Sequence, residues 1–175
     1  RKLKQNKQIK KSANDFKDLW ETDFDDIWNI DIKNNMLIAL NGWLTRKSDY
    51  GENIEKLSYP EKVFYLVLQL EGEVNNGGFL QFFYNSNGDF ANETPNALRA
   101  IGANKTAKIC VKALDVFGDK IPENPNGREK MLDNLFTNEI HEILTQCDTA
   151  FYEYPDDLVE LTYQFIFNNK TQFTR

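Results

Sequence analysis

The sequence has little of what most catalytic and metal sites use. Its 175 residues include one histidine, His141, and two cysteines, Cys110 and Cys147. It contains no HExxH, CxxC, Walker or Rossmann glycine pattern. His141 and Cys147 are six residues apart, so on one helix they would face opposite ways and could not form a dyad. The sequence therefore predicts no metal site, no cofactor, no catalytic residue and no enzymatic activity.

Long apolar runs are also missing, because no stretch of 18 apolar residues occurs. This excludes a membrane-spanning helix within the sequence. Both cysteines lie on apolar stripes of expected helices, which favours free buried thiols and a cytoplasmic location over a disulfide. The sequence does not begin with Met, so the possibility of a signal peptide or an anchor before Arg1 stays open.

Charges of the two signs are segregated along the chain, whose formal net charge is −6. Residues 1–11 carry six basic side chains and no acid, which predicts a basic flexible tail. Residues 12–32 carry seven acids against one lysine, and residues 131–169 carry eight acids without Lys or Arg. The densest acidic runs are Asp23, Asp25 and Asp26, and then Glu153, Asp156, Asp157 and Glu160.

Two interpretations of these acids remain open. They can be ordinary solvated helix faces. They can also form a surface that repels nucleic acid and attracts a basic protein. In the extreme case, rows of carboxylates imitate the DNA backbone, which carries one charge per ~1.7 Å of duplex.

Apolar residues recur at helical spacing almost throughout, and no convincing alternating strand occurs. A first helix is expected near residues 12–14, and a second start is marked by Ser58, Pro60 and Glu61. The apolar run 63–70 that follows predicts a central buried helix, with a buried strand as the competing interpretation. We expect residues 12–175 to form one all-α domain, an irregular compact bundle of about seven to nine helices.

Several breaks divide the predicted helices. The run Asn75-Asn76-Gly77-Gly78 is expected to end the central helix, since Asn and Gly tolerate the left-handed conformation. Loops are expected at residues 85–89 and 122–127, and a break at Tyr154-Pro155.

The segment 71–83, EGEVNNGGFLQFF, violates local helix rules. Glu71 and Glu73 oppose the dipole at a helix end, and Gly72 weakens a helix interior. One interpretation is structural: Glu71 caps a neighbouring helix or pairs with Arg99, and Gly72 permits close helix contact. The other is a polar pocket for a ligand, lined by Glu71, Glu73, Asn75, Asn76 and Gln81. Glu71 and Glu73 would point about 200° apart on a helix, so they cannot form a close carboxylate pair.

Residues 57–118 resemble a bacterial family of domains of unknown function. The resemblance is carried by LSYPEKVFYLVLQLEGEVNNGGFLQFFYNSNGDF and ETPNALRAIGANKTAKICVKALDVFG. The family core maps onto Glu73, Asn76, Gly77, Gly78, Phe79, Gln81, Phe82 and Phe83. The family includes a DNA-mimic protein, so the resemblance implies an acidic helical protein, a homodimer, that occupies the DNA-binding face of a transcription repressor. It implies a fold role, and no catalytic role, for the core residues.

Three functional hypotheses follow. The first is a non-enzymatic helical module, an acidic DNA mimic that binds a basic DNA-binding protein and no nucleic acid directly. The second is a small-molecule or enzymatic pocket around Glu71 and Gln81. The third is a scaffold domain held at a membrane by a segment that precedes Arg1.

Overall fold

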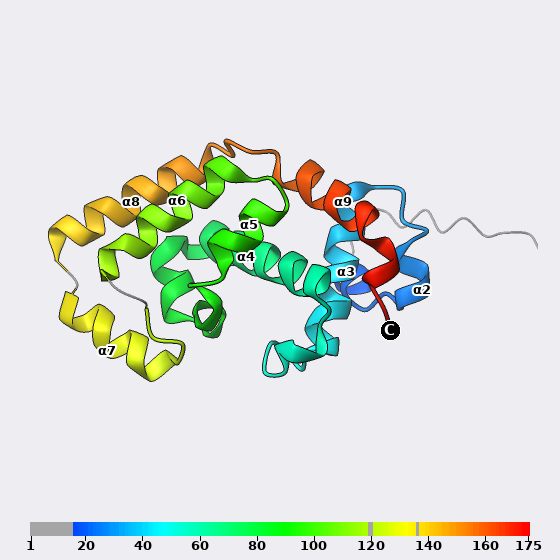
Figure 1. The fold of residues 1–175 in the computed structure, drawn as a ribbon, viewed down its shortest axis with the longest axis horizontal. Helices are drawn as coiled ribbons and strands as arrows, with labels where there is room; N and C mark the ends of the chain where they lie inside the picture. Colours follow the sequence, from blue (N-terminus) through cyan, green and yellow to red (C-terminus); the bar gives the residue numbers. More distant parts are fainter. Residues whose placement is uncertain (1–15, 119–120, 136) are drawn as a thin grey trace, which may run out of the picture.

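A computed structural model describes residues 16–118, 121–135 and 137–175, and these residues form nine α-helices without a strand (Figure 1). The helices are α1 (Phe16–Trp20), α2 (Phe24–Ile27), α3 (Lys33–Lys47), α4 (Tyr59–Tyr84), α5 (Thr94–Ala100), α6 (Asn104–Leu114), α7 (Pro125–Leu135), α8 (Asn138–Tyr152) and α9 (Leu158–Asn168). Four short 3-10 helices join them, η1 (Ile54–Lys56), η2 (Ser86–Phe90), η3 (Asp115–Phe117) and η4 (Lys170–Gln172). The all-α prediction is confirmed, whereas the basic tail 1–11 and the helix start at 12–14 lie outside the described residues.

Helix α4 is the centre of the fold and contacts α3, α5, α7, α8 and α9 (Figure 1). Its start is fixed by a capping box, in which the Ser58 and Glu61 side chains each accept from the other residue's backbone N–H. The apolar run after it is buried on most sides, with Phe64, Val67 and Leu70 fully enclosed. The strand interpretation of this run is therefore wrong, because the run is helical and neighbouring helices cover most of it.

A buried carboxylate holds the N-terminus of α4. Glu61 is fully buried and accepts from the backbone N–H groups of Ser58 and Thr174, each at 2.8 Å, and from Lys47 Nζ at 2.8 Å. The negative charge lies at the positive end of the helix dipole, where it is stabilising. The same contacts tie the end of α3 and the C-terminal residues to α4.

A buried guanidinium holds the opposite end of α4. Arg128 of α7 is fully buried and donates to the carbonyl oxygens of Phe83 at 2.8 Å and Asn85 at 2.9 Å. It also pairs with Asp89 at 2.5 Å. These carbonyls belong to a helix end that lacks intrahelical partners, so the arginine acts as a C-terminal cap provided by another helix.

Two expected loops contain helical turns. Residues 86–90 form η2, and α7 begins at Pro125, within the predicted loop 122–127. Proline suits the first position of a helix, where its missing N–H would be unpaired anyway. The Asn124 side chain accepts from Gly127 N–H at 2.8 Å and so caps this helix.

The outer helices pack around α4. Helices α6 and α8 lie side by side, and α8 and α9 follow one long edge of the molecule (Figure 1). Cys110 on α6 and Cys147 on α8 are both free and buried, and burial raises the pKa of Cys110 to about 12. Within the described ranges, no helix has the length and hydropathy that crossing a membrane requires.

Candidate functional site

The segment singled out in the sequence interrupts the helix, as predicted, and α4 continues beyond it after a kink. Gly77 and Gly78 have non-helical backbone angles, and Gly78 takes φ +76° in the left-handed region. A Cβ atom at Gly78 would also lie 2.5 Å from Asp148 Oδ2. Position 78 therefore needs glycine for both its backbone angle and its close approach to α8.

Helix α8 braces both sides of the kink. Asp148 Oδ1 accepts from the backbone N–H of Phe79, at 2.7 Å, just after the kink. The Tyr152 hydroxyl donates to the carbonyl oxygen of Val74, at 2.8 Å, just before it. Burial raises the pKa of Asp148, and the hydrogen bond from Phe79 partly opposes that rise. Backbone groups that the kink leaves without helical partners are thus satisfied from α8.

Glu71 belongs to the α8 side of the kink. The Tyr154 hydroxyl donates to Glu71 Oε1 at 3.0 Å and accepts from Asn75 Nδ2 at 2.6 Å. Burial raises the pKa of Glu71, and the hydrogen bond from Tyr154 works against that rise. The two structural roles expected for Glu71 are therefore wrong. The carboxylate that accepts from a backbone N–H group here is Asp148, and Arg99 donates to Asn96 instead of Glu71.

Glu73 faces a different group of side chains. Its Oε2 accepts from Gln81 Nε2 and Asn85 Nδ2, and its Oε1 accepts from Asn87 Nδ2, each at 2.8 Å. In a straight helix, residues eight and twelve positions apart would be about 12 and 18 Å apart along the axis. Direct contact is possible only because the Gly77-Gly78 kink folds the chain back on itself.

These side chains line an open concavity of about 340 Å³ on α4 and η2. Its lining consists of Glu73, Gly72 and five carboxamide side chains, those of Gln69, Asn76, Gln81, Asn85 and Asn87. No heavy atom lies within 4 Å of a Cβ built on Gly72. The expectation that Gly72 permits close helix contact is therefore wrong, because its Cα faces the open side of the concavity. We call these seven residues the carboxamide pocket.

A family model for DMP19-like proteins matches residues 55–169 of the chain. The chain belongs to the DMP19-like protein family. No curated protein and no solved structure matches it. The family match confirms the resemblance seen at residues 57–118 and extends it through α7, α8 and α9.

Within this DMP19-like core, the predicted site residues separate into three sets. Glu71 and Asn75 contact Tyr154, whereas Glu73, Asn76 and Gln81 line the carboxamide pocket. Gly77 and Gly78 form the kink between them. The sequence did not indicate the contributions of Asp148 and Tyr152 of α8 or of Tyr154 just after it, which lie about 70 to 80 residues away in the sequence. Asn85 and Asn87, which follow the Asn-Gly segment closely in the sequence, could have indicated the remaining lining of the pocket.

The predicted acidic surface divides into structural and free carboxylates. Asp156 accepts from Thr106 N–H at 2.8 Å and so caps α6, and Asp157 caps its own helix α9. Glu160 pairs with Lys33, and Asp25 pairs with Arg175.

The other three predicted acids, Asp23, Asp26 and Glu153, are exposed and make no side-chain hydrogen bond or ion pair to another described residue. The residues 153–160 lie inside the DMP19-like match, whereas residues 23–26 lie outside it. We therefore expect the acids around Glu153 to carry any function that the DMP19-like core provides.

One further absence concerns metals. Across the described ranges, no group of three or more His, Cys, Asp or Glu side chains is placed to hold a metal ion.

Proposed function

We propose that the protein is a non-enzymatic binding module whose acidic α8–α9 edge binds a basic, DNA-binding protein in the manner of a DNA mimic. The observation that carries this proposal is the charge of that edge. Residues 138–168 contain seven acids and neither Lys nor Arg, and they run along one side of the molecule (Figure 1). Membership of the DMP19-like family supports the same function.

The length of the α8–α9 edge can be compared with that of a DNA duplex. Helix α8 has 15 residues and is therefore about 22 Å long. Glu139, Glu142 and Glu153 are exposed along it and its C-terminal cap, and Asp157 follows in the link to α9. A duplex of that length carries about 13 phosphate charges, so these four carboxylates would replace only a part of them.

The neighbouring helix limits the charge of the edge. Helix α6 carries Lys105, Lys108 and Lys112, all exposed, beside α8. Lys112 donates to Gln146 Oε1 at 3.3 Å, and Lys105 donates to the Pro155 carbonyl at 3.3 Å. The three acids of α8 and the three lysines of α6 balance, so the net charge of −4 over α6 and residues 138–168 comes from the four acids that follow α8, and these favour a basic partner.

The test is capture of host proteins on immobilised protein at about 50 and 300 mM salt, identified by mass spectrometry. The decisive variant is Glu142→Lys with Glu153→Lys, because the side chain of neither residue bonds to another described residue. The wild type is expected to retain a basic DNA-binding protein that is released as salt rises, and the variant is expected to lose it.

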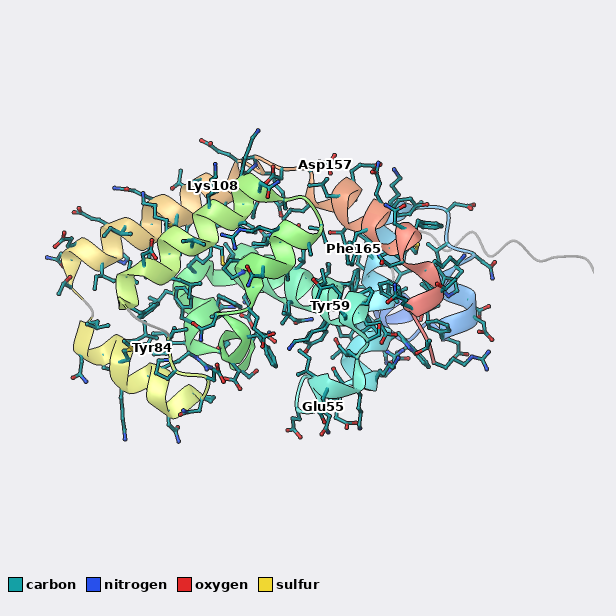
Figure 2. All side chains as sticks on the ribbon, in the orientation of Figure 1. Glu55, Tyr59, Tyr84, Lys108, Asp157 and Phe165 are labelled. Atoms are coloured by element: carbon teal, nitrogen blue, oxygen red, sulfur yellow. The ribbon has the colours of Figure 1, made fainter. Side chains whose placement is uncertain are left out.

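The matched control is Glu52→Lys with Glu55→Lys, which changes the net charge equally. Glu55 lies on the opposite side of the molecule from Asp157 (Figure 2). This control should retain the partner. Equal loss in both variants, or a partner whose binding ignores salt, would contradict the proposed use of the α8–α9 edge.

A further inference from the structure

The carboxamide pocket contains a carboxylate that no cation neutralises. Glu73 accepts three hydrogen bonds, and all of them come from neutral amides. In the part of the chain that the structure describes, no lysine or arginine forms an ion pair with it. The pocket therefore has a fixed negative charge, and an anionic ligand such as a phosphate would be repelled.

The chemistry of Glu73 decides how the surrounding amides are oriented. An ionised carboxylate can only accept hydrogen bonds, so Gln81, Asn85 and Asn87 must turn their NH₂ groups toward it. The amide oxygens of Asn85, Asn87 and Asn76 then receive no hydrogen bond from any described residue. A carboxylate accepts at about four positions, and only three are used here. Glu73 thus keeps one acceptor position unused, and the side chains that line the pocket beside it carry three further acceptors without a partner, so the pocket suits a ligand that is rich in donors.

Shape narrows the ligand further. The concavity of about 340 Å³ lies near the lower limit for ligand pockets, so it fits a small group better than a whole metabolite. Gly72 leaves its open side unobstructed because this residue has no side chain. Guanidinium is planar, carries five donors and no acceptor, and is permanently charged. An ammonium has only three donors around a compact, strongly hydrated charge.

We propose that the carboxamide pocket binds the guanidinium group of an arginine, which the basic partner protein inserts beside Glu73. The inference rests on the proposed function only for the source of that arginine. Binding would pair the half-buried Glu73 with a cation and give hydrogen-bond donors to the amide oxygens of Asn76, Asn85 and Asn87. The arginine would be an anchor of the kind that dominates protein interfaces.

The test is an NMR titration of the ¹⁵N-labelled protein, followed at the side-chain amide signals of Gln81, Asn85 and Asn87. The ligands are N-acetyl-arginine amide, its lysine counterpart and its citrulline counterpart, each added to about 50 mM. Citrulline keeps the shape of arginine without its charge. We expect saturable shifts of these signals with arginine, several-fold weaker binding of lysine, and none of citrulline.

Three variants make the result specific. Glu73→Gln should weaken arginine binding at least about tenfold, because it removes the charge but keeps the shape. Gly72→Ala should also weaken arginine binding, because it adds a methyl group to the open side of the pocket, whereas the fold is kept because Ala suits a helix. Glu71→Gln is the matched control, since Glu71 contacts Tyr154 outside the pocket, and it should bind arginine normally.

Equal shifts with arginine and citrulline, or no saturation at these amides, would overturn the inference. So would unchanged binding by either Glu73→Gln or Gly72→Ala. The outcome is separable from the proposed function, because partner capture that fails only with Glu142→Lys and Glu153→Lys stands without an arginine pocket. Conversely, if the pocket binds arginine but no salt-sensitive partner is captured, the proposed function of the acidic edge is rejected and the arginine pocket stands.

Discussion

At the scale of single residues, the charged groups that matter most to the fold are the buried ones. Glu61 and Arg128 occupy opposite ends of α4, and each has the sign that the helix dipole favours at its end. Each also satisfies backbone groups that no helix residue can reach. Glu61 is visible in the sequence through the Ser58-Pro60-Glu61 signal. Arg128 is not visible in this way, because the α4 carbonyl groups that it caps are more than 40 positions away in the sequence.

A prediction at this scale concerns Glu71. Burial raises its pKa in the folded protein, so the folded state holds the proton more tightly than the unfolded chain. The stability that Glu71 contributes is therefore complete below about pH 4.3, the ordinary value, and is lost as pH rises through the raised value. Glu71→Gln cannot titrate, so its stability relative to wild type should improve from pH 4 to pH 7. Urea unfolding at a series of pH values measures this.

Tyr154→Phe gives the opposite check. The Tyr154 hydroxyl donates to Glu71 and lowers its pKa, so removing the hydroxyl should raise that pKa further. The variant should lose more stability than the wild type over the same pH range. Parallel stability curves for wild type, Glu71→Gln and Tyr154→Phe would show that the fold does not couple to this carboxyl.

At the scale of elements, the kinked helix α4 explains the unusual segment of the sequence. The Asn-Gly run interrupts the helix, as expected, and a second helical part continues in a new direction because α8 supplies partners for the groups that the kink exposes. Local rules identify where regular structure fails. They do not tell whether the chain stops or turns, since that depends on Asp148 and Tyr152, which pack from a distant helix.

Two glycines in α4 should respond in opposite ways to alanine. Gly72→Ala should raise the free energy of unfolding by about 0.5–1 kcal/mol, because Gly72 is helical and its Cβ would meet no atom. Gly78→Ala should lower it by about 1–3 kcal/mol, because its φ of +76° suits only glycine. Chemical denaturation of the two variants measures the difference. A neutral Gly78→Ala would mean that the kink does not require its left-handed backbone.

The candidate site shows how far sequence reasoning carries at this scale. The spacing of Glu71 and Glu73 correctly placed them on different sides of a helix, and the helical fold and its buried centre follow from periodicity. The assignment of Asp156 to a partner surface could not be refined from sequence. Its cap on Thr106 joins residues 50 positions apart, and only the fold brings them together.

At the scale of the whole molecule, negative charge is concentrated along the α8–α9 edge. The acids of α8 and α9 lie within the DMP19-like match, and both helices pack directly on α4 without using Glu139, Glu142 or Glu153 for structure. Carboxylates that do not stabilise the fold are available for a partner. The α2 acids Asp23 and Asp26 form a second exposed group outside the match.

The most direct test of the DNA-mimic account is competition with DNA itself. Host lysate is loaded on immobilised duplex DNA and washed, and the column is then developed with this protein at constant salt. The account predicts that the wild type displaces a specific basic protein from the DNA, and that Glu142→Lys with Glu153→Lys does not. Displacement by both proteins alike, or by neither, would contradict the claim that the α8–α9 edge takes the place of DNA.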